Sequence, residues 1–224
     1  MVKKKPTNKY YFSVEGETEQ WYLKWLQELI NQTEEAVCRV SIDCPVKKNP
    51  LKHAKSLTIM RKTEIYHFFD YESDEPIHVK GFLETLENMK KAEKLGKQIK
   101  YKSGYSNFTF DLWIVLHMAE CNTSYTHRKQ YITPINRVFG EKFENMDEFK
   151  KEPNFKRCLK KMNLSNVIDA INRARKIMQR NRENGYTLYE YKGYQYYKEN
   201  PSLASWQAIE KILLDCKLIK KQPA

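Results

Sequence analysis

The chain has 224 residues, of which 41% are hydrophobic and 13% aromatic, so it can build one sizeable core, alone or with a smaller appended domain. Its 40 Lys and Arg outnumber its 28 Asp and Glu. The net charge of +12 favours a polyanionic partner, first of all nucleic acid, although a basic protein without such a partner has the same balance. The cysteines lack zinc-type spacing and no long apolar segment occurs, which predicts reduced packing cysteines and a cytoplasmic protein without membrane association.

Strand-like and helical segments alternate through the first half of the chain. A run of aromatic and apolar residues at 9–15 predicts a buried strand, and apolar residues at helical spacing over 18–31 predict a helix after it. The alternation continues with strands at 37–44, 65–69 and 97–102 and with helices at about 50–61 and 76–95. Strands that alternate with helices predict an α/β fold with a parallel, Rossmann-like sheet of about four strands.

Helical periodicity dominates beyond Gly104. Helices are expected within 107–119, 128–139, 146–162, 165–182 and 202–218, and no strand pattern of equal strength returns. We therefore expect an α/β catalytic core at residues 1–105 and a helical part at 106–224. Because no Pro/Gly/Ser-rich linker separates the two, the helical part is expected to pack on the core, where it offers a surface for nucleic acid or a partner.

Acidic residues follow two of the predicted strands. Glu15 ends the first strand, and Asp70 and Glu72 end the strand at 65–69. Because the ligands of open α/β sheets collect at the carboxyl ends of the strands, these side chains are expected to meet around a hard cation such as Mg²⁺. The alternative is that they are ordinary acidic turn residues, with Glu17 and Glu19 favouring a helix N-terminus.

Three motifs strengthen the first interpretation. Val-Glu15-Gly-Glu-Thr-Glu19 resembles the first motif of the Toprim fold, and Phe-Phe-Asp70-Tyr-Glu72 stands where Toprim proteins carry Asp-x-Asp. The segment 106–117, Ser-Asn-Phe-Thr-Phe-Asp-Leu-Trp-Ile-Val-Leu-His, is similar to a signature of the RloB-like family, which includes an abortive-infection protein. The departures are Glu72 in place of aspartate, Phe108 in place of proline and Asp111 in place of glutamate.

The resemblance implies a Toprim-like fold and a metal-dependent nuclease that hydrolyses phosphodiesters with Mg²⁺ or Mn²⁺. Glu15, Asp70 and Glu72 are then the metal ligands, with Glu19 as an additional candidate. Lys102 becomes a candidate for neutralising transition-state charge, the alternative being a solvated lysine. Asp111 is expected to order metal-bound water or to pair with a basic residue.

Two further residues of the signature segment are expected to have structural roles. Asn107 is expected to cap the helix of residues 107–119. His117, on an aromatic face, is expected to be a core residue.

Candidate nucleic-acid contacts lie in the helical part. Arg173, Lys176 and Arg180 share one face of the predicted helix at 165–182, a spacing suited to a row of phosphates, although a solvated face has the same pattern. The tyrosines between 186 and 197 suit base stacking, or else the packing of a small core.

The resemblance also bears on biological role. It implies an effector of anti-phage abortive infection encoded beside an ATPase, and that ATPase must be a separate partner because this chain has no P-loop motif. RNA such as tRNA is favoured over DNA because its cleavage suits a toxin that halts translation. A DNA endonuclease and a non-catalytic Toprim-fold adaptor that binds nucleic acid or the ATPase are the alternatives, and an oligomer is compatible with each.

Overall fold

The computed structural model describes residues 5–221. The first half contains the elements β1 (Thr7–Val14), α1 (Glu17–Gln32), β2 (Arg39–Asp43), α2 (Pro50–Ser56), β3 (Thr63–Tyr71), α3 (Pro76–Glu93) and β4 (Ile99–Asn107). The second half contains α4 (Asp111–Met118), the 3₁₀ helix η1 (Arg128–Tyr131), α5 (Ile132–Phe139), α6 (Met146–Phe149), α7 (Glu152–Leu159), α8 (Leu164–Glu183), β5 (Tyr189–Tyr191), β6 (Tyr194–Tyr196), β7 (Ser202–Leu203) and α9 (Ser205–Asp215). The predicted alternation of strands and helices in the first half is confirmed.

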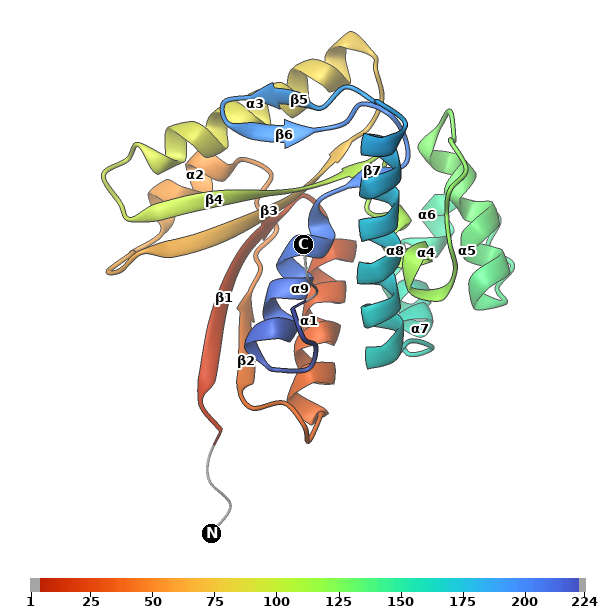
Figure 1. Ribbon diagram of the computed structural model, residues 1–224, viewed down its shortest axis with the longest axis horizontal. Coiled ribbons are helices and arrows are strands. Elements are labelled where there is room, and N and C mark those ends of the chain that lie inside the picture. The colour runs from red at the N-terminus through yellow and green to blue at the C-terminus, as the bar shows by residue number, and fades with distance from the viewer. Residues whose placement is uncertain (1–4, 222–224) are drawn as a thin grey trace.

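A five-stranded sheet with the order β2-β1-β3-β4-β7 organises the molecule (Figure 1). The first four strands are parallel, as predicted, and β7 joins the edge antiparallel to β4. The sequence analysis assigned the residues of this fifth strand to a helix at 202–218, whereas the helix begins only at Ser205. Because β1, β3 and β4 are adjacent and parallel, their carboxyl ends lie side by side at one end of the sheet.

Each face of the sheet carries its own core, because alternate side chains of a strand point to opposite faces. On β3, Phe68 packs with α1, α4, α8 and α9, whereas Ile65, Phe69 and Tyr71 pack with α2 and α3. In Figure 1, α1 and α9 accordingly lie on one side of the sheet and α2 and α3 on the other. Two buried cores hold the strand ends in fixed positions.

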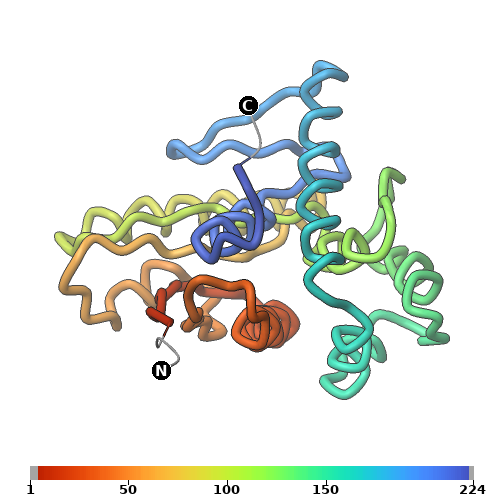
Figure 2. The backbone as a smooth tube through the Cα atoms, turned by 60° about the horizontal axis from the view of Figure 1, so that its bottom comes forward, coloured from red at the N-terminus to blue at the C-terminus, as the bar shows by residue number. Residues whose placement is uncertain are grey.

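The second half of the chain is built around α4. Seven of its residues are buried, and α8 packs along it; Figure 2 shows α8 passing beside the edge of the sheet. The prediction that Asn107 caps this helix is wrong: β4 continues to Asn107, whose side chain donates to the carbonyl oxygens of Lys198 and Glu199. The expected boundary at residue 105 falls inside β4, and α9 returns to the sheet.

A hairpin of β5 and β6 occupies the tyrosine-rich segment, for which the sequence analysis predicted no strands. Its two turn residues, Lys192 and Gly193, both have positive φ angles, as the tightest hairpin turns require. Tyr194 and Tyr196 are buried against the α3 side of the sheet. Of the two roles expected for these tyrosines, core packing is therefore the one that the structure shows for both.

All five cysteines are buried and none forms a disulfide, as expected. Among the helices of residues 5–221, none combines the length and the apolar character needed to cross a bilayer.

Candidate active site

Four carboxylates meet where the parallel strands end. Glu15 follows β1, Glu19 lies in the first turn of α1, Asp70 is the penultimate residue of β3, and Asp111 is the first residue of α4. Backbone contacts fix the first pair: the Glu15 amide donates to the Phe68 carbonyl oxygen at 3.2 Å, and Glu15 Oε2 accepts from the Asp70 amide at 3.4 Å. The sheet therefore places Glu15 beside Asp70, as the sequence predicted.

Gly16 makes room for Glu19. A Cβ atom at Gly16 would lie 2.9 Å from Glu19 Oε2, closer than real Cβ contacts allow. The Thr18 hydroxyl donates to the same oxygen at 3.0 Å, and the Glu19 side chain is buried although it carries a carboxylate. The space left by Gly16 and the hydrogen bond from Thr18 thus keep the Glu19 carboxylate in the site.

Asp111 is 1% exposed and brings the fourth carboxylate from the start of α4. Its Oδ2 accepts from the Thr109 hydroxyl at 2.8 Å and lies 3.0 Å from Lys150 Nζ. Pairing with a basic residue is one of the two roles expected for Asp111. Lys150 itself comes from the junction between α6 and α7, about forty residues further along the chain.

Burial and mutual repulsion raise the pKa values of Glu15, Glu19 and Asp70. Burial and the charges of Glu19 and Glu72 raise the pKa of Glu15 to about 7. The hydrogen bond from the Asp70 amide lowers the same pKa, but its effect is smaller than that of burial. Burial and the charge of Glu19 raise the pKa of Asp70 well above its usual range. For Lys150, burial lowers the pKa, but the attraction of Asp111 and Asp70 outweighs it and the pKa rises. These perturbed values in one cluster are typical of a functional site.

The interactions described above do not involve one oxygen atom of Asp70 and one of Asp111. Asp70 Oδ1 and Asp111 Oδ1 are buried and have no hydrogen-bond partner among residues 5–221. Within residues 5–221, no three His, Cys, Asp or Glu side chains are grouped closely enough to form a complete cage for a metal ion. Mg²⁺, however, is usually held by one or two carboxylates together with water and substrate phosphate. The two unpaired oxygens fit that coordination.

Glu72, a predicted metal ligand, is engaged elsewhere. Its carboxylate pairs with Arg128 at 3.1 Å and with His78 at 3.3 Å. It is still near enough for its charge to raise the pKa of Glu15. Arg128 and His78 therefore already hold the second acidic residue of the Phe-Phe-Asp-Tyr-Glu motif, and the structure gathers Glu15, Glu19, Asp70 and Asp111 without it.

Lys102 lies away from the cluster. It stands opposite Tyr66 in the register of β3 and β4, and its amino group pairs with Glu64 at 3.7 Å. Asp70 stands opposite Ser106, four residues further along, which is about 13 Å at about 3.3 Å per residue. The structure does not bring Lys102 to the carboxylates.

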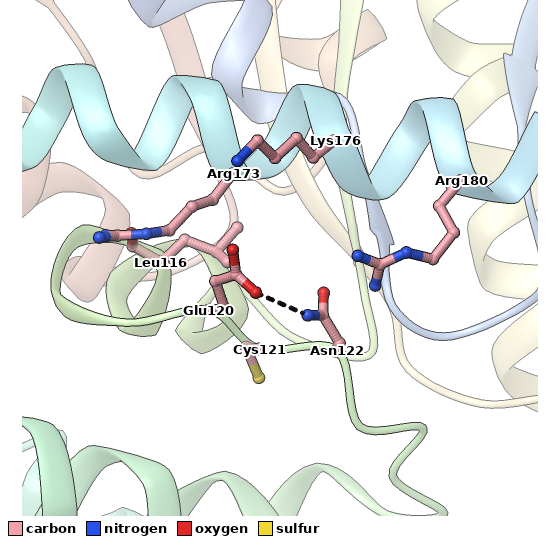
Figure 3. A pocket seen from close by; sticks show the side chains of 7 residues that line it. All are labelled: Leu116, Glu120, Cys121, Asn122, Arg173, Lys176 and Arg180. Carbon is pink, nitrogen blue, oxygen red and sulfur yellow. Dashed lines mark hydrogen bonds between the residues drawn. The ribbon is translucent and has the colours of Figure 1, made fainter.

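Arg173, Lys176 and Arg180 line a shallow hollow between α8 and residues 120–122, which follow α4 (Figure 3). Arg173 is fixed there, because it donates to the carbonyl oxygens of Leu116 and His117 at the end of α4. Within the part of the chain that the structure describes, the Lys176 and Arg180 side chains form no ion pair. Figure 3 shows Arg180 reaching toward Asn122, whose amide bonds Glu120.

His117 is a core residue, as predicted. Its ring bonds the Tyr22 hydroxyl at 3.1 Å and the Trp113 carbonyl oxygen at 2.8 Å, and burial lowers its pKa to about 4. Lys150, by contrast, was missed by sequence reasoning. It lies in a lysine-rich stretch that gave no signal to distinguish it from Lys151, and only the tertiary fold separates the two.

A sequence model of one protein family, described as RloB-like protein, matches residues 10–212. That range contains all four carboxylates and Lys150. Searches of curated proteins and of solved structures found no match.

Proposed function

The chain belongs to the RloB-like protein family, and we propose that it is a metal-dependent nuclease whose active site is the carboxylate cluster at the ends of β1 and β3. The observation that carries this proposal is the pair of buried, unpaired oxygens, Asp70 Oδ1 and Asp111 Oδ1, beside two further carboxylates. Buried polar atoms normally have partners, and a bound divalent cation would give these two carboxylate oxygens one, which supports the proposal. The resemblance of the first two motifs to the Toprim fold supports the same chemistry.

Asp70 and Asp111 would hold Mg²⁺ or Mn²⁺, with Glu19 close by. When bound, such a cation stabilises charge on a phosphoryl group and lowers the pKa of water. Glu15 is suited to take a proton from the attacking water at Oε1, because Oε2 is engaged with the Asp70 amide and its pKa of about 7 is matched to neutral pH. Lys150 keeps positive charge at the rim, facing an anionic substrate.

The proposed substrate is nucleic acid, with RNA such as tRNA favoured over DNA. The net charge of +12 supports a polyanionic substrate, and Lys176 and Arg180, which lack ion-pair partners among the described residues, are proposed to contact its phosphates. The role as an effector of abortive infection with a separate ATPase partner rests on the resemblance to the RloB-like family.

Purified protein incubated with tRNA and with DNA, in Mg²⁺, in Mn²⁺ and in EDTA, tests the proposal. Cleavage should require the metal and should be lost in Asp70→Asn, which keeps the size of the side chain and removes its charge. Asp147→Asn, an exposed aspartate of α6, is the matched control and should cleave as the wild type does.

Metal binding gives a second readout that does not depend on an activating partner. Mn²⁺ should raise the melting temperature of the wild type and of Asp147→Asn, and it should not do so for Asp70→Asn. Cleavage that survives both EDTA and Asp70→Asn contradicts the proposal, as does a wild-type protein that binds no Mn²⁺. Metal binding without cleavage, with and without the ATPase, supports the adaptor instead.

A further inference from the structure

Lys150 is the main cation of the carboxylate cluster. Its Nζ lies 3.0 Å from Asp111 Oδ2, and the charges of Asp111, Asp70 and Glu19 all raise its pKa. Lys48 also acts on the cluster, because its charge lowers the pKa of Glu15. Buried carboxylates without a compensating cation would strongly destabilise the fold, so Lys150 supplies charge balance that the cluster needs.

The Lys150 ammonium group can move away from Asp111 without a change in the backbone. Lys150 directly follows α6 as the C-cap residue, and its side chain is 36% exposed, whereas Asp111 is 1% exposed. A lysine has a flexible four-carbon stem and a compact, strongly hydrated ammonium group. Rotation about the side-chain bonds therefore moves the ammonium group from Asp111 into water while the backbone of α6 and α7 stays in place.

From these observations we propose that Lys150 is a tethered competitor of the divalent cation. The ammonium group balances the cluster in the metal-free protein and must withdraw from Asp111 Oδ2 when a cation binds to Asp70 and Asp111. This inference rests on the proposed function, because it requires that the cluster binds a divalent cation. Its consequence is that the protein has a lower metal affinity than the carboxylates alone would give.

Mn²⁺ binding measured by calorimetry tests the inference, with Lys150→Gln beside the wild type. Removing the competing charge should lower the dissociation constant for Mn²⁺ by at least about fivefold, the low end of coupling between sites that influence one another. Without metal, Lys150→Gln should melt at a lower temperature than the wild type, and Mn²⁺ should close that gap. Lys151→Gln, which removes the same charge one residue along at an exposed position, should match the wild type in both measurements.

A measurement on the wild-type protein covers the case in which Lys150→Gln does not fold. Mg²⁺ should shift the ¹³Cε NMR signal of Lys150, assigned by its absence in Lys150→Arg, and leave that of Lys151 in place. An unchanged Mn²⁺ affinity in Lys150→Gln, or a Lys150 signal that does not respond to Mg²⁺ in a protein that binds it, overturns the inference and leaves the nuclease proposal standing. If no variant and no wild-type protein binds Mn²⁺, the proposed function fails first.

Discussion

The backbone amide of Asp70 donates a hydrogen bond to Glu15 Oε2, so the ends of β1 and β3 hold two carboxylates side by side. Glu19 adds a third charge that raises the pKa of both. Such crowding of like charges in a buried site opposes folding, and it persists where function needs it. The cluster is therefore expected to lower the stability of the metal-free protein.

Asp70→Asn should stabilise the metal-free protein while it weakens metal binding. The amide cannot ionise, so it takes an unfavourable charge out of the cluster, and we expect the free energy of unfolding at pH 7 to rise by about 0.5–2 kcal/mol, the usual gain from relieving unfavourable charge. Urea unfolding measures the change. Because Asp111 is the main partner of Lys150, Asp111→Asn should stabilise less than Asp70→Asn does. A loss of stability in Asp70→Asn would contradict the repulsion argument.

Gly16→Ala should impair the site with little effect on the fold. Gly16 has φ −137°, which any residue adopts, so alanine adds no backbone strain there. Its Cβ would displace the Glu19 carboxylate, and the loss of such a supporting group should weaken Mn²⁺ binding by about tenfold. Calorimetry on Gly16→Ala, on Glu19→Gln and on the double variant separates the causes. If alanine acts through Glu19, the double variant should bind no more weakly than Glu19→Gln alone.

Gly104→Ala should destabilise the protein. Gly104 stands opposite Phe68 in the register of β3 and β4, and a Cβ atom there would lie 2.4 Å from the Phe68 ring. Because the Phe68 side chain is fully buried, we expect the free energy of unfolding to fall by about 1–3 kcal/mol, as in other overpacked cores. Urea denaturation measures this loss.

Gly81→Ala is the matched control for Gly104→Ala. Gly81 lies in the interior of α3 at an exposed position, and its Cβ would meet nothing within 4 Å. Alanine should therefore stabilise the protein by about 0.5–1 kcal/mol, through the lower entropy of the unfolded chain and better helix propensity. Equal effects at the two glycines would show that the Phe68 contact does not decide the outcome.

The sequence predicted the sheet well because its parallel strands are buried on both faces. Continuous apolar runs mark such strands, and the helices between them show clear periodicity. The short elements were missed for a physical reason: β7 has two residues and is defined by its pairing with β4, and the β5–β6 hairpin is held by packing on α3. Alternating tyrosines around Lys192-Gly193 were the available signal, but they also fit base stacking.

The sequence predicted the part of the site whose position is set by the ends of the strands. Glu15 and Asp70 come together because neighbouring parallel strands must end at the same edge. The ion pairs of Glu72 with Arg128 and of Lys102 with Glu64 join residues far apart in the sequence, so no spacing rule reveals them. Lys150 reaches the cluster through the packing of α7 against α1, a long-range contact that a single sequence does not encode in any motif.

His67 should make stability depend on pH. Ser13 Oγ lies 2.7 Å from His67 Nδ1, His67 Nε2 is buried without a partner, and burial lowers the pKa of His67 to about 3. In the unfolded chain this pKa is about 6.5, so between about pH 6.5 and pH 3 the unfolded state binds more protons. The contribution of His67 is therefore fully present above pH 6.5 and is lost as the pH falls.

His67→Asn keeps a polar atom near Ser13 but does not titrate. It should be less stable than the wild type at pH 7, by about 1–3 kcal/mol, because the smaller side chain leaves a cavity. Urea midpoints at pH 7, 6, 5 and 4 should show the gap narrowing as the pH falls. All other titrating groups are shared, so they cancel in the comparison. Parallel pH curves would mean that His67 does not titrate differently on folding.

Lys176 and Arg180 should contribute to the salt dependence of nucleic-acid binding. Each cation that neutralises a phosphate of a single strand contributes about 0.7 to the slope of log affinity against log salt concentration. The double variant Lys176→Gln/Arg180→Gln, made in the Asp70→Asn background so that the ligand stays intact, should therefore lower the slope by about 1.4. Arg173 is unsuitable for this test, because it also binds the carbonyl oxygens at the end of α4.

Lys52→Gln/Lys55→Gln in the same background is the control. It removes the same charge from exposed positions of α2, on the opposite side of the sheet from α8. Fluorescence anisotropy with a single-stranded RNA, between 50 and 200 mM salt, measures both slopes; this is about the range over which phosphate contacts dominate affinity. If nucleic acid binds at the hollow in Figure 3, only the variant of Lys176 and Arg180 should lower the slope. Equal changes in both variants would mean that the net charge of the protein, and not this surface, causes the effect.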